Sequence, residues 1–403
     1  MSSAANAPRS DDARIRVFGS LCGLVFLVNF GRVTFAPLIG ADVFTTAFDA
    51  SAATAGFIAT AAWLGSAAPR LPAGYLLTRF PRERVVLGTG LFLALAAFLM
   101  AQANSVNTVL VGAFLVGIAS GVYFIAANPL VSELFPDRVG RVLGIHGTAS
   151  QLAAVVAPLL VVAVLAQASW RLVFYGLGTA AIVSALAFFH TSKRAEMPQA
   201  GAADRHLLRA ARNQWPIVLT GVVIMGLTGF VWQGVFNFYV KYLTATKGVD
   251  GATAQTLLTV VFAAGVPAFW YAGKLADRLP TLRLLLTILG AFAVCLFSLT
   301  LSSGFLPIVA VSVATGFVIH SLFPTMDTFL LGSLPDEDRG SAYAVYSGSM
   351  MVMQANGSAA VGWFVDAGFA YNTIFQTLAG GLAVLVTLLY VAYRLGWLPH
   401  AAR

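Results

Sequence analysis

The sequence predicts an all-α polytopic membrane protein with twelve transmembrane helices arranged as two pseudo-symmetric six-helix bundles. Three observations predict it: the composition, the recurrence of long apolar segments, and an internal repeat. The 403 residues are 59% hydrophobic and only 10% charged, and the mean hydropathy is +0.83. A soluble domain carries about 25% charged residues. So few charges are typical of a chain whose outer surface faces lipid.

Apolar segments long enough to cross a membrane recur from one end of the chain to the other. About 20 residues cross a hydrocarbon layer ~30 Å thick, and polar or Gly/Pro-rich breaks separate twelve such segments. We expect spans at 15–38, 51–76, 84–102, 107–133, 141–166, 170–190, 214–241, 253–276, 282–301, 305–331, 340–365 and 370–395.

The polar segments outside these spans give the expected domains. Residues 1–14 form a polar tail without regular structure, 15–190 the first bundle, 191–213 a linker, 214–395 the second bundle, and 396–403 a second tail. Arg205, Arg209 and Arg212 share one face of a short helix within the linker. We expect that helix to lie on the membrane surface.

The distribution of basic residues predicts the orientation. With the N-terminus in the cytoplasm, 18 of the 24 Lys and Arg fall in inner segments and only 3 in outer loops. Cytoplasmic loops carry such an excess, so we expect a cytoplasmic-membrane protein with both termini inside. The net charge of +8 then reflects topology and contact with anionic lipids, without nucleic acid.

Several classes of function lack the residues they need. Cys22 and Cys295 are the only cysteines and lie in apolar runs, which excludes a disulfide framework and a thiolate metal site. No P-loop, zinc motif or nucleophile elbow is present, so we expect no enzyme, cofactor or metal. An intramembrane hydrolase using His320, Asp327 and Ser347 is the catalytic alternative.

A single offset of 199 residues relates the two halves of the chain. It pairs Gly74 with Gly273, Arg79 with Arg278, Gly117 with Gly316, and Asn128 with Asp327. One offset that serves several spans indicates two similar six-helix halves. Gly117 and Gly121, four residues apart, also predict a close contact between helices.

The loops after the second and eighth spans, which begin at Gly74 and Gly273, resemble the Gly-x-Leu-x-Asp-Arg-x-Gly-Arg-Arg loop of the major facilitator superfamily. Residues 133–141 are similar to that family's acidic–Pro–Arg-Gly element, with a partial echo at 335–340. The resemblance covers essentially the whole chain and implies a cytoplasmic gate. Its residues would be Gly74, Arg79, Glu133, Arg138, Gly273, Asp277, Arg278 and Arg339.

The gate motif departs from the family pattern in both copies, since Pro81 and Pro280 stand where Gly is expected, and the first copy also lacks its acidic residue. Thr78 replaces the usual Asp, while the second loop keeps Asp277. A neutral hydrogen bond through Thr78 would be weaker than a charge-assisted one, which implies an asymmetric gate. Alternatively, Arg79 and its basic neighbours only reflect the positive-inside rule.

Two arginines lie within expected spans, where a charge costs several kcal/mol unless it is paired or faces a water-filled cavity. The run around Arg70 resembles the second span of nitrate/nitrite porters, and Asn29-Phe30-Gly31-Arg32 resembles the first span of organic-anion porters. Both resemblances imply that Arg32 and Arg70, with Asn29, bind an anion, which a planar guanidinium grips with two hydrogen bonds. Phe269 stands where nitrate porters have a second Arg. Alternatively, both arginines hold helices together through backbone carbonyls or Asn29.

The second half offers further polar candidates. Trp232, Gln233 and Asn237 in the seventh span are predicted to shape the substrate site. His320 and Asp327 lie seven residues apart, on one helix face, and are predicted to couple proton movement, because His titrates near neutrality. Alternatively, Asp327 is a gate residue equivalent to Asn128.

Taken together, the sequence predicts a secondary active transporter of a small anion that works by alternating access. Its expected partners are the substrate, a coupling proton or cation, and membrane lipids, and it is expected to be a monomer. A porter for neutral organic solutes or drugs and a non-transporting membrane sensor are the alternatives.

Overall fold

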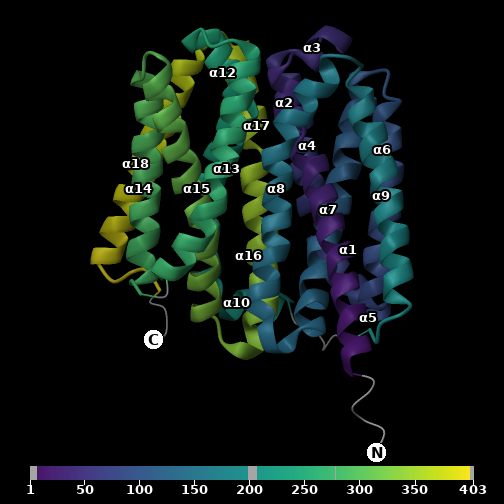
Figure 1. Ribbon diagram of the computed structural model, residues 1–403. Helices are drawn as coiled ribbons and strands as arrows, with labels where there is room; N and C mark the ends of the chain where they lie inside the picture. Colours follow the sequence, from purple (N-terminus) through teal and green to yellow (C-terminus); the bar gives the residue numbers. More distant parts are fainter. Residues whose placement is uncertain (1–6, 198–206, 277, 400–403) are drawn as a thin grey trace, which may run out of the picture. The chain divides into compact units, whose positions relative to one another are not determined.

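The computed structural model describes residues 7–197, 207–276 and 278–399, which form helices and contain no strand (Figure 1). By contacts the chain forms two compact units, Met1–Thr34 with Ala61–Asp204, and Phe35–Thr60 with Arg205–Arg403. We call them unit 1 and unit 2. The bundles expected at 15–190 and 214–395 stay a prediction.

Unit 1 is built on α1 and α6, each of which packs against α7 and α9, while α1 also packs against α8. Its helices are α1 (Ala7–Val33), the second part of α4 (Ala52–Ala67), α5 (Arg70–Arg79), α6 (Arg82–Ala101), α7 (Val106–Leu134), the 3₁₀ turn η1 (Pro136–Arg138), α8 (Val139–Leu165) and α9 (Arg171–Ser192).

Unit 2 has its most extensive packing between α13 and α15 and between α14 and α15. Its helices are α2 (Phe35–Gly40), α3 (Val43–Phe48), the first part of α4, α10 (Leu207–Asn213), α11 (Trp215–Gly221), the π-helical turn η2 (Val222–Gly226), α12 (Leu227–Lys247), α13 (Gly251–Ala276), α14 (Thr281–Leu301), α15 (Phe305–Ser333), α16 (Asp336–Ala355), α17 (Gly357–Asp366) and α18 (Tyr371–Arg394).

Within the described residues, ten helical stretches are long and apolar enough to cross a membrane. The expected spans 51–76 and 340–365 are not among them; the first is divided into α4 and α5, and the second into α16 and α17. The count of twelve spans is therefore not confirmed.

The breaks in these helices have local causes. Proline lacks the N–H that bonds the preceding turn, and its ring crowds that turn; Pro69 separates α4 from α5, and Pro37 follows the break between α1 and α2 at Thr34. At the start of α17, a Cβ on Gly357 would lie 1.9 Å from the carbonyl oxygen of Phe230. The chain there bends where α12 and α17 meet backbone to backbone.

The structure also bears on the predictions for the N-terminal segment and for the linker between the two halves. Helix α1 begins at Ala7, so the expectation that 1–14 lacks regular structure is wrong for the part that is described. The predicted short linker helix is present as α10 and carries Arg209 and Arg212. Arg205 lies outside the described residues.

The predicted glycine contact is confirmed and is repeated at the offset of 199 residues. A Cβ on Gly117 would lie 2.1 Å from the oxygen of Ala62, and one on Gly316 would lie 2.1 Å from the oxygen of Val261. Ala62 and Val261 are themselves 199 positions apart. Small residues let membrane helices approach closely, and both halves use this device at the same place.

In unit 2, polar contacts hold the first part of α4 against the end of α17 and the end of α16. The carboxylate of Asp366 accepts hydrogen bonds from the backbone N–H groups of Ala52 and Ala53, both at 3.0 Å. The hydroxyl of Thr60 donates to the oxygen of Ala355 at 2.8 Å. A carboxylate at a helix N-terminus is favourable because it satisfies free donors and the helix dipole.

Candidate functional site

The most concentrated polar cluster inside unit 1 forms around Arg32, in the last turn of α1. Three residues earlier, Asn29 lies on the same helix face and its Oδ1 accepts a hydrogen bond from Arg32 Nη2 at 2.6 Å. The amide nitrogen of Asn29 donates in turn to the backbone oxygen of Ser150 on α8, at 2.7 Å. Asn29 therefore ties α1 to α8 and fixes the direction of the guanidinium.

The face of the same guanidinium lies on aromatic rings. Arg32 Cζ is 4.0 Å from the ring centroid of Trp63 on α4 and 5.8 Å from that of Phe124 on α7. A second, longer hydrogen bond runs from Nη1 to the hydroxyl of Ser66 at 3.4 Å. A cation over a Trp face gains about 0.5–2 kcal/mol. The stack and the two side chains hold Arg32 in one position.

The charge of Arg32 is left uncompensated by these contacts. Its hydrogen-bond partners are a neutral amide and a neutral hydroxyl, and its buried Nε–H has no acceptor among the described residues. The positive charge of Arg70 also repels it. The two guanidiniums are therefore within electrostatic reach of each other, and a nearby negative charge would offset their repulsion.

Arg70 is placed by a helix break that the span prediction did not include. It is the first residue of α5, directly after Pro69, and its side chain is half-buried. Close packing of α4 on α7 positions the break, since a Cβ on Gly121 would lie 2.3 Å from the oxygen of Ser66.

The polar candidates of α12 form a closed network in unit 2. Asn237 Nδ2 donates to the hydroxyl of Ser358 at 2.9 Å and to the backbone oxygen of Gln233 at 3.0 Å, and the Ser358 hydroxyl donates to the same Gln233 oxygen at 3.0 Å. All three side chains are buried. Their contacts link α12 to α17.

Trp232 and His320 lie together in an aromatic cluster, which is formed by Trp232, Phe236, Phe262, Phe269, Phe292, His320 and Phe323. The ring of His320 is buried, and its Nδ1 lies 2.7 Å from the oxygen of Gly316. Because that oxygen can only accept, Nδ1 carries the hydrogen, and Nε2 is the position that can take a proton.

Asp327 has a different partner from His320, although both lie on α15. The hydroxyl of Tyr343 on α16 donates to Asp327 Oδ1 at 2.8 Å. The structure thus gives the two residues predicted for proton coupling separate surroundings, and it joins Asp327 to α16.

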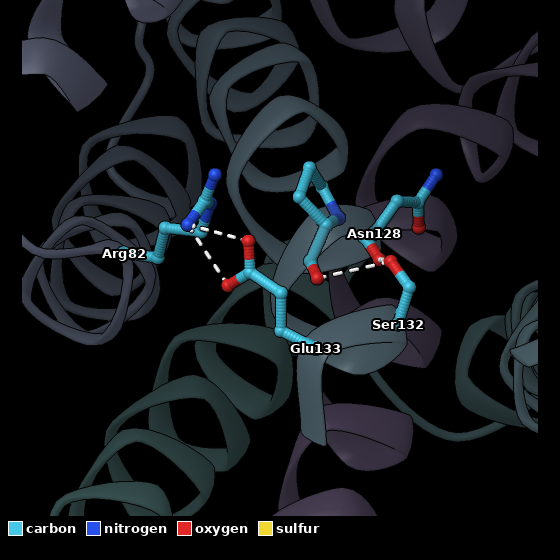
Figure 2. A network of polar contacts seen from close by, with 5 residues as sticks. Arg82, Asn128, Ser132 and Glu133 are labelled. Atoms are coloured by element: carbon cyan, nitrogen blue, oxygen red, sulfur yellow. Dashed lines mark hydrogen bonds and ion pairs between the residues drawn. The ribbon is translucent and has the colours of Figure 1, made fainter. Parts of the chain in front are cut away.

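Of the predicted gate residues, Glu133 has the most definite contact (Figure 2). Arg82 Nη1 lies 2.8 Å from each oxygen of its carboxylate, which joins the start of α6 to the last turn of α7. Beside it, the hydroxyl of Ser132 donates to the backbone oxygen of Asn128 at 2.9 Å. The sequence analysis did not predict Arg82 as a gate residue. Its position directly after Pro81, among other basic residues of the loop, is the sequence feature that could have identified it.

Three other predicted gate arginines contact aromatic rings or a backbone oxygen. Arg79 and Arg138 lie over the rings of Tyr75 and Phe135, at 5.0 and 5.4 Å. Arg339 donates to the backbone oxygen of Leu334 at 3.2 Å. Gly74 and Gly273 lie in α5 and α13, Arg278 is exposed, and Asp277 lies outside the described residues.

We expect the Arg82–Glu133 pair to make a small, salt-sensitive contribution to stability. The Arg82 side chain is 10% exposed and the Glu133 side chain 37%. Water can therefore solvate the Glu133 carboxylate once its partner is removed, and pairs open to solvent typically contribute about 0–1 kcal/mol. Arg82→Gln should therefore lower the unfolding temperature slightly at low salt and less at 1 M salt. Exposed Arg84 provides the control Arg84→Gln. A large loss that salt leaves unchanged would show that Arg82 stabilises the fold in another way.

Comparisons with known proteins agree with this architecture. The sequence profile of the Major Facilitator Superfamily matches residues 21–311 and, in a second match, 222–402. The uncharacterized MFS-type transporter YwfA of Bacillus subtilis is 23% identical over 294 residues, 70% of each chain. The multidrug resistance protein MdtL of Shewanella sp. is 26% identical over 169 residues, 40% of this chain and 42% of that one.

Solved structures show the same fold at low sequence identity. A bacterial homolog of the human lysosomal transporter Spinster superposes with a TM-score of 0.77 at 16% identity, over 94% of this chain and 97% of the other. A POT family transporter in complex with a thioalcohol-conjugated peptide gives 0.76 at 11% identity, over 94% and 96%. With the family profile covering both halves, the chain belongs to the Major Facilitator Superfamily of membrane transporters.

Proposed function

We propose that this chain is a secondary transporter that moves a small anion across the cytoplasmic membrane by alternating access. The observation that carries the proposal is the Arg32 cluster. Its guanidinium is fixed by Asn29 and Ser66, stacked on Trp63, and close enough to Arg70 for repulsion. A bound anion would relieve that repulsion and accept hydrogen bonds from groups that are already oriented.

The same contacts explain why Arg32 has more than a structural role in this proposal. A guanidinium that served only to join helices would be most stable with a carboxylate or with several backbone carbonyls, because a buried charge is costly without compensation. Its partners are instead two neutral side chains. The anion would supply the missing charge.

A ligand screen on the purified protein tests this proposal. Thermal stability would be measured with nitrate, phosphate, carboxylates, sugar phosphates, neutral sugars and cationic drugs. We expect an anion to raise the unfolding temperature of the wild type and to have no effect on Arg70→Ala. Stabilisation by neutral or cationic compounds alone would contradict the proposal.

That contrary result would favour a second function, a porter for neutral organic solutes or drugs. Relatives named multidrug resistance proteins match 40% and 60% of the chain. The aromatic cluster around Trp232 in unit 2 also contains apolar side chains of the kind that such compounds contact, of which Phe269 is 40% exposed.

We further propose that transport is coupled to proton movement through His320 and Asp327. His320 keeps Nε2 available, and Asp327 is held by a single hydroxyl donor. We expect His320→Ala to flatten the pH dependence of uptake in proteoliposomes, because it removes the titratable imidazole from this ring cluster. Phe323→Ala, which alters the same ring cluster without removing a titratable group, is the control. An unchanged pH profile in His320→Ala would exclude the histidine.

A further inference from the structure

A second polar site lies in unit 1, between the start of α1 and the end of α9. It is a cavity of about 280 Å³. Its lining residues are Asp12, Ala13, Arg16, His190, Thr191 and Arg194. On α1, Arg16 and Arg32 are sixteen residues apart, which is about 24 Å along a helix. The cavity is therefore distinct from the Arg32 cluster.

The charges in this cavity suit a phosphodiester. Arg16 and Arg194 each carry a guanidinium, and neither makes an ion pair among the described residues. Asp12 contributes one carboxylate. The two guanidiniums and the one carboxylate sum to one positive charge, and a phosphodiester carries one negative charge. A phosphate oxygen accepts hydrogen bonds well from two guanidiniums.

Apolar side chains continue from the cavity along the outer face of α9. Val183 is 61% exposed, Leu186 56% and Phe189 40%, and Phe189 lies four residues before Lys193 and five before Arg194. Lys193 Nζ lies 4.1 Å from the ring centroid of Phe189. Positions three or four apart share a helix face, so the α9 surface changes from apolar to basic within about two turns. This order of apolar and then basic surface suits a phospholipid, whose acyl chains would lie beside the apolar residues and whose charged headgroup would lie at the basic end.

The inner wall of the cavity is fixed by the two helices. The hydroxyls of Ser20 on α1 and Thr191 on α9 lie 3.3 Å apart, and Thr191 also donates to the oxygen of Ala187 at 2.9 Å. The wall is thus preformed before any ligand binds, which lowers the entropic cost of binding.

We propose that this cavity binds the headgroup of an anionic phospholipid of the phosphatidylglycerol type. Arg16 and Arg194 hold the phosphate, and the Asp12 carboxylate accepts hydrogen bonds from the glycerol hydroxyls. The acyl chains lie along Val183, Leu186 and Phe189. Basic pockets beside membrane helices are a general means of binding such headgroups. This site is independent of the transported substrate.

Native mass spectrometry of the full chain in detergent tests the proposal. Apparent affinity would be measured for phosphatidylglycerol, phosphatidylcholine and phosphatidic acid. We expect the doubly substituted variant Arg16→Gln/Arg194→Gln to bind phosphatidylglycerol at least tenfold more weakly, with phosphatidylcholine unchanged. Asp12→Asn should reduce the preference for phosphatidylglycerol over phosphatidic acid. Arg84→Gln, another exposed arginine of unit 1 that does not line the cavity, is the matched control.

Two results would overturn the proposal. One is equal phosphatidylglycerol affinity in the wild type and the double variant, or an equal loss in Arg84→Gln, because either would show that binding does not depend on this cavity. The other is full competition by soluble glycerophosphoglycerol at the concentration of the lipid, which would identify a free phosphodiester as the ligand.

Discussion

Arg32→Gln is expected to abolish anion uptake in proteoliposomes while the protein still inserts and remains monodisperse. The substitution removes the charge and the planar fork but keeps a polar side chain that can reach Asn29, 2.6 Å from the guanidinium in the wild type. Each hydrogen bond between a charged donor and an anion contributes about 1.5–3 kcal/mol. Losing two of them lowers affinity by at least about a hundredfold.

The variant Arg32→Lys distinguishes the contribution of the positive charge to uptake from that of the planar guanidinium group. Lysine keeps the positive charge, but it cannot stack flat on Trp63 or donate a bidentate pair. We expect uptake between those of the wild type and Arg32→Gln. Uptake would be followed with the anion that gives the largest thermal shift.

The control for both variants is Arg84→Gln, which removes an exposed arginine of the same unit and should leave uptake unchanged. Because Arg32 is a poorly compensated charge, its removal should not lower the unfolding temperature. Normal uptake by Arg32→Gln would remove the anion site from the proposal, whereas loss of folded protein would show that Arg32 is structural.

The helices were largely predictable because their cause is local. Long apolar segments must be helical in lipid, where backbone groups have no water to bond. Their interruptions were harder to predict. Proline within an apolar segment can kink a helix or end it, and the sequence does not say which. In the structure α4 ends just before Pro69, beside a close contact with α7.

The candidate site was predictable only within single helices. Asn29 and Arg32 are three apart, so their contact follows from helical spacing, and the alternative that Asn29 holds Arg32 agrees with the observed hydrogen bond. Trp63 and Ser66 belong to α4, and the sequence does not specify how α4 is rotated about its axis. Helical spacing also placed His320 and Asp327 on one face of α15, but it did not predict their partners. His320 contacts the backbone oxygen of Gly316, and Asp327 accepts a hydrogen bond from Tyr343 on α16.

The repeat gave information that single helices could not. The offset of 199 residues, found in the sequence alone, pairs Gly117 with Gly316. The structure shows that these two glycines make equivalent close contacts in their own halves. Such agreement arises when both halves have the same backbone-to-backbone packing, because a Cβ at either position would clash with a backbone oxygen of the neighbouring helix.

Gly117→Ala should therefore destabilise the protein strongly. The added Cβ would lie 2.1 Å from the oxygen of Ala62 and 3.0 Å from Gly65 Cα. These are backbone atoms, so no side-chain rotation can make room, and α4 must move away from α7. Overpacking typically costs about 1–3 kcal/mol, and we expect the upper part of that range. Thermal unfolding in detergent would measure it, and Gly316→Ala should show a similar loss.

Gly88→Ala is the matched control, since nothing lies within 4 Å of its added Cβ. Alanine is favoured over glycine in a helix by about 1 kcal/mol, so this variant should be as stable as the wild type or more so. Both substitutions add the same methyl group, but Gly117→Ala should lower the unfolding temperature and Gly88→Ala should leave it unchanged or raise it. Movement of α4 in Gly117→Ala would also displace Trp63, which follows Ala62 directly, and so weaken the stack on Arg32. If Gly117→Ala unfolds at the wild-type temperature and keeps full uptake, the close contact of α4 with α7 does not hold the Arg32 cluster in place.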